Sequence, residues 1–148
     1  MEATKVPAGQ GYYLDTSVWI DLYEDRLGYL GEPLGDYAWE FVFLIKASGS
    51  FLVISEMVYH ELEKRYSAEE VRCMMNPFGS QIVVVGITDS LVDEAKSISR
   101  GRTVPFGDAL HAVISRDNGF ILIARDNHFR RLRDICPFLK PEEILGIV

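Results

Sequence analysis

The chain has 148 residues, of which 48% are hydrophobic and 25% are charged, and its net charge is -7. This length and composition indicate one globular domain with a sizeable core. The negative charge excludes a basic nucleic-acid-binding surface spread over the whole chain, so RNA would have to be bound through a local cationic patch or through metal ions. The longest apolar stretch, residues 39–45, contains Glu40 and is much shorter than the ~20 residues of a membrane span, so we expect no membrane segment.

The two cysteines give a first indication of cellular compartment. Cys73 and Cys136 lie far apart in the sequence and match no zinc-binding spacing. The first residues of the chain also lack the apolar core of a signal peptide. We therefore expect a cytoplasmic protein whose thiols are reduced.

Short apolar runs predict four β-strands, at residues 12–14, 51–54, 82–85 and 120–123. The last three runs, FLVI, IVVV and FILI, show no alternation of polar and apolar residues. Such runs are typical of strands that are buried on both faces of a parallel sheet.

Helix-length segments lie between these runs, at residues 17–25, 36–47, 56–75, 89–100 and 108–118, with an expected break near Ser67. The alternation predicts one domain over residues 1–148, a three-layer α/β/α sandwich around a central, mostly parallel sheet of four to five strands. Residues 1–11 would form an N-terminal extension without an assigned function.

Two acidic residues follow two of the predicted strands. Asp15 comes directly after residues 12–14, and Asp126 comes shortly after residues 120–123. Binding sites in open parallel sheets form outside the carboxyl ends of the strands, so both carboxylates could share one crevice. The structural interpretation, that each carboxylate only caps the helix after it, remains open.

Glu61 occupies an unusual position in the segment EMVYHELEKRY. On a helical wheel it falls among the apolar residues Met57, Val58 and Leu62. A charge on a core-facing arc needs a partner. Arg65, one turn later, would be a structural partner, whereas a metal ion or a catalytic water would be a functional one.

Asp108 opens the predicted helix GDALHAVISRDNG, where free backbone N–H groups favour an anion. On the wheel, Asp108, His111 and Ser115 flank the apolar stripe. We interpret His111 as a hydrogen-bonded residue at the edge of the core. We interpret His128, two residues after Asp126, as a surface residue.

Four stretches carry a resemblance to a known family: YYLDTSVWIDL, VISEMVYHEL, VPFGDALHAVIS and NGFILIARDNHF. Their residues and order resemble PIN domains, metal-dependent ribonucleases that include the toxins of many toxin–antitoxin pairs. The resemblance covers residues 12–144 and implies an acidic catalytic site. Its members here would be Asp15, Glu61, Asp108 and Asp126, with Asp15, Asp108 and Asp126 as metal ligands and Ser17 beside them.

One position departs from the family pattern. PIN domains usually have a threonine or serine two residues before the last acid, and this chain has Ala124. The hydroxyl that would orient the acid or a bound water is missing. Asn127 could substitute for it.

A cluster of carboxylates favours a divalent cation. Two carboxylates ~4 Å apart repel by about 4 kcal/mol at an effective dielectric constant near ~20. Oxygen ligands suit Mg²⁺ or Mn²⁺. The hypothesis is therefore a ribonuclease that hydrolyses RNA phosphodiester bonds with a metal-activated water, which Glu61 could hold or deprotonate.

Basic residues near the last acid could attract the RNA phosphates. Arg125, Arg130 and Arg131 would bind RNA in this interpretation. The alternative interpretation of the same residues is a solvated helix face.

Two other functions use the same residues. The fold could bind RNA or a protein without cutting anything, which the alanine at position 124 and the acidic net charge favour. A phosphatase with Asp15 as nucleophile would need a second acid two residues later, where the chain has Ser17.

The resemblance also implies partners, because relatives commonly form homodimers and the toxins among them are held by antitoxin peptides. The predicted helix 36–47 is apolar around almost its whole circumference. Such a helix is either deeply buried or part of an interface.

Overall fold

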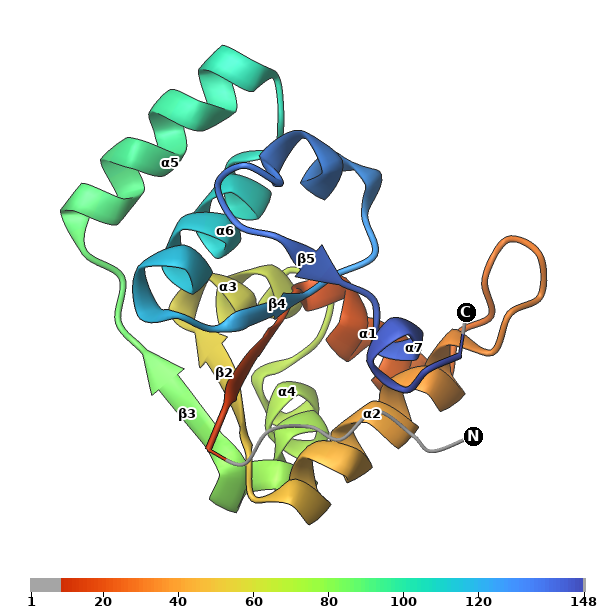
Figure 1. Ribbon diagram of the computed structural model, residues 1–148. Coiled ribbons are helices and arrows are strands. Elements are labelled where there is room, and N and C mark those ends of the chain that lie inside the picture. The colour runs from red at the N-terminus through yellow and green to blue at the C-terminus, as the bar shows by residue number, and fades with distance from the viewer. Residues whose placement is uncertain (1–8, 148) are drawn as a thin grey trace.

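The computed structural model describes residues 9–147 and contains a five-stranded parallel sheet with the order β3-β2-β1-β4-β5. The strands are β1 (Gly11–Leu14), β2 (Phe51–Ser55), β3 (Ile82–Val85), β4 (Ile121–Ile123) and β5 (Phe138–Leu139) (Figure 1). All four neighbouring pairs are parallel. The predicted α/β class with a central sheet is therefore confirmed.

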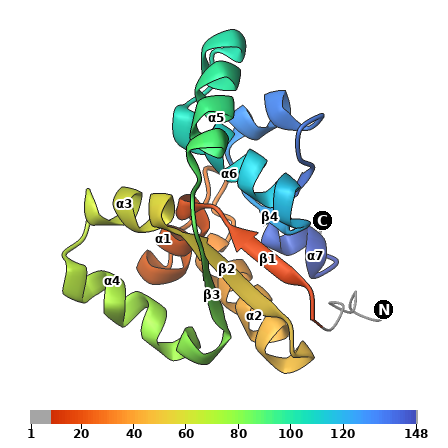
Figure 2. The same cartoon turned by 90° about the vertical axis from the view of Figure 1, so that its left-hand side faces the viewer.

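Helices cover both faces of the sheet. On one side lie α1 (Thr16–Glu24), α2 (Leu34–Ser48), α3 (Glu56–Glu63) and α4 (Ala68–Met75), and on the other lie α5 (Asp89–Arg102) and α6 (Phe106–Asn118) (Figure 2). The remaining elements are the 3₁₀ helices η1 (Asn76–Gln81) and η2 (Asn127–Leu132) and the short helix α7 (Pro141–Ile144), which packs on α2.

Local signals in the sequence set several helix ends. The break expected near Ser67 is present, because Ser67 and Glu70 form a reciprocal capping box that starts α4. Gly49 and Gly119 end α2 and α6 with positive φ angles of 75° and 69°, a conformation that glycine adopts without strain.

The central strand anchors the core. Tyr12, Tyr13 and Leu14 of β1 are at most 1% exposed, because β1 pairs with β2 on one side and with β4 on the other. Asp15 follows at the carboxyl end of this fully enclosed strand. The fold therefore holds the first acidic residue rigidly.

The prediction that β3 is buried on both faces is wrong. Val83 and Val84 are 42% and 57% exposed, because β3 is an edge strand that pairs only with β2. An apolar run shows that a segment is a strand but not where the strand stands in the sheet.

The helix predicted at 36–47 is the longer α2, and it is only partly buried. Phe41, Val42 and Ile45 are in the core, whereas Trp39 and Phe43 are 39% and 63% exposed. One face of this apolar helix is therefore buried, and an interface at its exposed face remains a prediction. The loop between α1 and α2 projects from the body of the protein (Figure 1).

The N-terminal extension was expected over residues 1–11, of which residues 1–8 lie outside the described residues. Gly11 belongs to β1 and is buried. Both cysteines are free, Cys73 at the surface and Cys136 inside. Within residues 9–147, every helix is too short or too polar to span a membrane.

Candidate metal centre

The predicted acids meet at the carboxyl edge of the sheet. The backbone N–H of Asp15, just after β1, donates to the carbonyl of Ile123 at the end of β4 (2.9 Å). In the sheet, β2 and β3 lie on one side of β1, and β4 and β5 lie on the other. The strand order therefore reverses direction between β1 and β4, where Asp15 is located. Ligand sites of open parallel sheets occur at such points.

Asp15 is held in place by the start of α1. Its carboxylate accepts from the Ser17 hydroxyl (2.6 Å) and the Ser17 backbone N–H (3.4 Å), and the residue is only 5% exposed. The structural interpretation of Asp15 as a helix cap is therefore correct as far as it goes. Burial nevertheless raises the pKa of Asp15, although the charge of His111 and the Ser17 hydrogen bonds oppose this.

Asp108, Asp126 and His128 form a group whose ligand atoms all lie within 4.8 Å of one another. Nδ1 of His128 is 2.8 Å from Oδ1 of Asp126 and 3.3 Å from Oδ2 of Asp108. Asp126 also accepts from the His128 backbone N–H (2.9 Å) and so caps η2. His128 is at the surface, as interpreted from the sequence, but its ring faces both acids.

The Oδ2 atom of Asp108 is buried, and no group in residues 9–147 forms a hydrogen bond to it. Burial raises the pKa of Asp108 to about 7, and the nearby charges of Asp15 and Asp126 add to the shift. Nδ1 of His128 lies 3.3 Å from this atom without forming a well-directed hydrogen bond. Because a buried carboxylate oxygen is costly when nothing compensates it, this atom needs a proton, the charged ring of His128 or a cation.

Glu61 reaches the same place from α3. Its Oε1 accepts from the Thr16 hydroxyl (3.0 Å) and is 2.7 Å from Nε2 of His111. The alternative pairing with Arg65 is wrong, because Arg65 binds Glu24 (3.0 Å). A Cβ on Gly107 would lie 3.1 Å from Oε2 of Glu61, so the glycine allows α6 to pass close to this carboxylate.

The most important residue that the sequence interpretation missed is His111. It is fully buried rather than at the edge of the core. Its Nδ1 is 2.6 Å from the Tyr13 hydroxyl, which in turn is 2.6 Å from the Ser55 hydroxyl. The one signal in the sequence for a role of His111 is its position one helical turn after Asp108. Its contact with Tyr13 of β1 depends on the tertiary fold and is not visible in the sequence.

His111 also provides positive charge among the acids. Its Nε2 is 3.6 Å from Oδ1 of Asp15. Burial lowers the pKa of His111, but the hydrogen bond to Glu61 and the charges of Asp15 and Glu61 outweigh burial, so the net shift is upward. The same hydrogen bond lowers the pKa of Glu61 against the effect of burial. Both shifts favour a protonated His111 beside an ionised Glu61.

The donor set fits a divalent cation. Asp108 and Asp126 offer carboxylate oxygens and His128 offers one nitrogen, all within 4.8 Å of one another. Asp15 is not a member of this group, although its charge acts on Asp108. Oxygen ligands suit Mg²⁺ and Mn²⁺, and Mn²⁺ also accepts an imidazole. The buried oxygen of Asp108 within this group is the observation that carries the fit.

The other predicted residues are placed as follows. Ser17 contacts Asp15 as expected, and Ala124 is buried. Asn127 does not replace the missing hydroxyl beside Asp126, because it is exposed and lines a neighbouring cleft.

The three arginines expected to bind RNA differ from one another. Arg125 pairs with Asp21 (3.0 Å) and Glu142 (2.6 Å) inside the protein. Arg131 points to the backbone carbonyls of Arg102 and Thr103. Arg130 and Arg131 are both exposed, but of these two only Arg130 lines the cleft that Arg125 and Asn127 also line.

The parallel sheet flanked by helices matches the α/β fold of PIN-domain proteins. The family model for the PIN domain matches residues 12–135, so the chain belongs to this family. PIN domains are in general nucleases.

Solved structures share the fold. The VapBC2 complex of Rickettsia felis bound to a promoter DNA fragment has a chain with a TM-score of 0.65 and 16% identity, covering 88% of this chain and 98% of that one. A toxin–antitoxin complex from Klebsiella pneumoniae has a chain with a TM-score of 0.61 and 17% identity, covering 88% of this chain and 97% of that one. PAE2754 from Pyrobaculum aerophilum has a TM-score of 0.61 and 17% identity, covering 93% of this chain and 88% of that one. No curated protein matched the chain.

Proposed function

We propose that this PIN domain is a divalent-metal-dependent endoribonuclease that hydrolyses RNA phosphodiester bonds. The observation that carries the proposal is the group that the buried oxygen of Asp108 forms with Asp126 and His128, whose ligand atoms all lie within 4.8 Å of one another. Asp15 acts on Asp108 electrostatically from the end of β1. Such a group of acids is strongly disfavoured without a cation.

Each acidic residue has a distinct part in this proposal. Asp15, Asp108 and Asp126 would hold Mg²⁺ or Mn²⁺. When bound, the cation lowers the pKa of a coordinated water and reduces the negative charge of the scissile phosphate. Glu61 has Oε1 fixed by Thr16 and His111, so its Oε2 would hold or deprotonate the attacking water.

Three further side chains keep the acids in position. Ser17 fixes the orientation of the Asp15 carboxylate through its 2.6 Å hydrogen bond. His111 and Tyr13 join Glu61 to β1 and through Ser55 to β2. These groups restrict the rotamers of the acids before substrate arrives.

The test is cleavage of a fluorescent single-stranded RNA in the presence of Mn²⁺. Asp15→Asn should abolish cleavage while its circular dichroism spectrum remains that of the wild type, because asparagine also caps helices. Asp93→Asn, on the exposed face of α5, removes the same charge and should leave cleavage unchanged. Undiminished cleavage by Asp15→Asn would refute the proposal.

The competing function, binding without catalysis, is separated by the wild-type protein alone. A binding module retains RNA over long incubation with Mn²⁺ and produces no shorter fragments. A nuclease produces fragments in proportion to time, and EDTA stops their formation.

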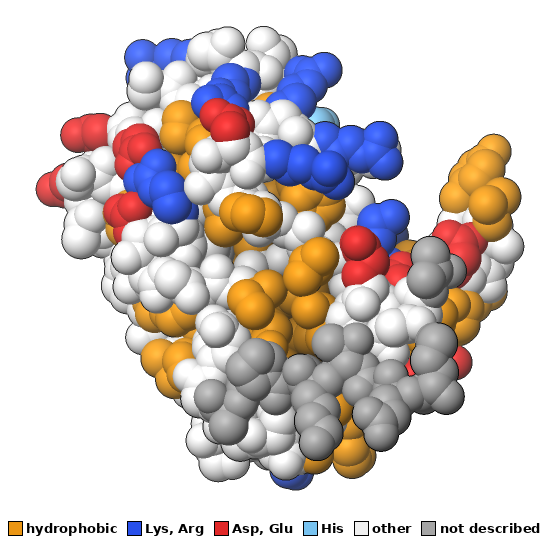
Figure 3. All heavy atoms as spheres, in the orientation of Figure 1, with side chains coloured by type: hydrophobic (Ala, Val, Ile, Leu, Met, Phe, Trp, Pro, Cys, Tyr) orange, Lys and Arg blue, Asp and Glu red, His pale blue; other side chains and the backbone are white. Residues whose placement is uncertain are grey.

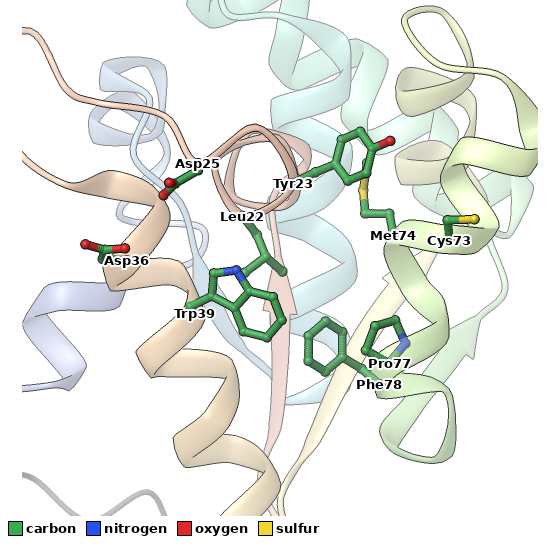
Figure 4. A pocket seen from close by; sticks show the side chains of 9 residues that line it. All are labelled: Leu22, Tyr23, Asp25, Asp36, Trp39, Cys73, Met74, Pro77 and Phe78. Carbon is green, nitrogen blue, oxygen red and sulfur yellow. The ribbon is translucent and has the colours of Figure 1, made fainter.

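We also propose that the protein is a toxin held by an antitoxin segment, since two of the similar structures are of toxin–antitoxin proteins. A cleft of about 390 Å³ opens between α1, α2, α4 and η1, where Trp39, Met74 and Phe78 form apolar walls (Figure 4). Asp25 and Asp36 lie at one end. This chemistry fits an apolar segment that carries a basic residue. The homodimer remains a prediction.

A further inference from the structure

A second cleft lies directly beside the metal centre, between η2 and α7. We call it the η2–α7 cleft, and it has a volume of about 310 Å³. It is lined by Arg125, Asn127, Arg130, Arg133, Phe138, Lys140, Glu142 and Glu143. Four of these residues are cations and two are acids, on a chain whose net charge is -7.

The two acids of the η2–α7 cleft are already engaged. Oε2 of Glu142 binds Arg125 at 2.6 Å, and Oε1 of Glu143 accepts from the Lys140 backbone N–H at 3.0 Å. Nη2 of Arg125 is buried without a hydrogen-bond partner in residues 9–147. Arg130 and Arg133 are exposed and free of any ion pair in that part of the chain. Oε1 of Glu142 is likewise buried without a hydrogen-bond partner in that part of the chain, and Glu143 has no ion pair there. With four cations against two acids in its lining, the cleft nevertheless has a net positive charge.

An aromatic ring completes the lining. Phe138 of β5 is half-buried, and the guanidinium of Arg133 stands 5.2 Å from its ring centroid. Phe129 supports the ring from behind at 5.8 Å between centroids. Because the guanidinium lies over the ring, a nucleobase could stack on the ring where Arg133 turns from it to a phosphate. Figure 3 shows Lys and Arg side chains gathered over this part of the face, next to hydrophobic side chains.

The η2–α7 cleft and the metal centre share one turn of the chain. Asp126 faces Asp108 and His128, whereas its neighbours Arg125 and Asn127 line the cleft. A strand bound across the acids would therefore reach this cleft next.

We propose that the η2–α7 cleft binds the nucleotide of single-stranded RNA next to the scissile phosphodiester, with its phosphate on Arg130, Arg133 and Lys140 and its base against Phe138. This inference rests on the proposed function, because it names how the same site holds its substrate. Such a cleft would let a protein with a net charge of -7 bind an anionic strand, because the phosphates would contact the local cations of the cleft.

The test measures binding in EDTA, so that no metal-dependent step contributes. The probe is a fluorescein-labelled single-stranded RNA decamer, followed by anisotropy at several salt concentrations. The variant Arg130→Ala/Arg133→Ala should bind about tenfold more weakly at low salt, and its log–log salt slope should fall by about 1.4, at ~0.7 per lost phosphate contact. Phe138→Leu keeps the apolar volume and should weaken binding by about fivefold or more, through lost stacking.

Lys46→Ala/Arg72→Ala is the matched control, because it removes the same charge from the exposed faces of α2 and α4. It should bind as the wild type does. Equal weakening by both double variants, or no weakening by Arg130→Ala/Arg133→Ala, overturns the cleft. A wild type that binds through the cleft but cuts nothing with Mn²⁺ leaves the cleft standing and refutes the nuclease. If the wild type cuts RNA with Mn²⁺ but Arg130→Ala/Arg133→Ala binds RNA as tightly as the wild type, the nuclease stands and the cleft proposal is refuted.

Discussion

His111 joins two of the predicted site carboxylates, with Nε2 at 2.7 Å from Oε1 of Glu61 and at 3.6 Å from Oδ1 of Asp15. The ring is completely buried. When it is protonated, it brings a positive charge to both acids. His111 thus holds Glu61 and Asp15 in place, and we expect it to stabilise the folded protein as well.

Replacing His111 by leucine should destabilise the protein by about 3 kcal/mol, because two largely buried carboxylates lose their charged partner. Tyr13→Phe removes only the hydroxyl on the other side of the ring and should cost about 1 kcal/mol. Urea unfolding in EDTA measures both values. A leucine variant as stable as the wild type would show that the ion pair contributes nothing.

Asp108 makes the stability of the metal-free protein depend on pH. Its pKa is about 7 in the folded protein against 3.8 for an unperturbed carboxyl. Between these values the folded state binds more protons than the unfolded state, so the free energy of unfolding falls as pH rises. Urea unfolding in EDTA should show about 4 kcal/mol less stability at pH 8 than at pH 4 from this group.

Asp108→Asn is the control for that pH dependence, because an amide does not titrate. The variant should lose most of the decline between pH 4 and pH 8. A decline of the same size in Asp108→Asn would place its origin in other groups, such as Asp15 or Asp21, whose pKa values burial also raises.

Mn²⁺ should stabilise the folded protein at neutral pH. At a free concentration one hundred times the dissociation constant, the gain is about 2.7 kcal/mol, or about 5–10 °C in Tm for a chain of this size. Asp126→Asn should reduce this shift to less than half, whereas the exposed Asp93→Asn should keep it. An equal shift in both variants would show that Mn²⁺ binds elsewhere.

The sequence allowed the acids to be found but not their surroundings. Asp15 and Asp126 follow apolar runs, and the carboxyl edge of a parallel sheet is predictable from such runs. Glu61 stood out as a charge on an apolar arc, but its partner was misjudged, because Arg65 at i+4 finds Glu24 instead. Local spacing gives the candidates for a pair, and the tertiary fold selects among them.

Other elements had too little local signal. β5 is two residues long and α7 is four, too short for a hydrophobic period to show. His111 looked like an edge residue, because its burial depends on Tyr13 from a strand almost a hundred positions earlier. The exposed face of β3 likewise depends on strand order, which an apolar run does not carry.

Arg125 illustrates the same limit from the other side, since it was expected to bind RNA and is instead paired with buried Asp21. Arg125→Met should destabilise the protein by about 3 kcal/mol, because Asp21 is left buried with only the solvent-exposed Arg26 as an ion-pair partner. Arg26→Ala, on the exposed partner 3.7 Å from Asp21, should cost less than about 1 kcal/mol. Similar urea midpoints for the two variants would contradict the structural role of Arg125.

The most direct measurement is the anomalous difference density of crystals grown or soaked in Mn²⁺. We predict a peak within coordination distance of Asp108 and Asp126, with Asp15 as a further direct or water-mediated ligand, and its absence in crystals of Asp108→Asn. Crystals saturated with Mn²⁺ that show no peak among these acids, or in which Asp108 binds only protein groups, would contradict the metal centre.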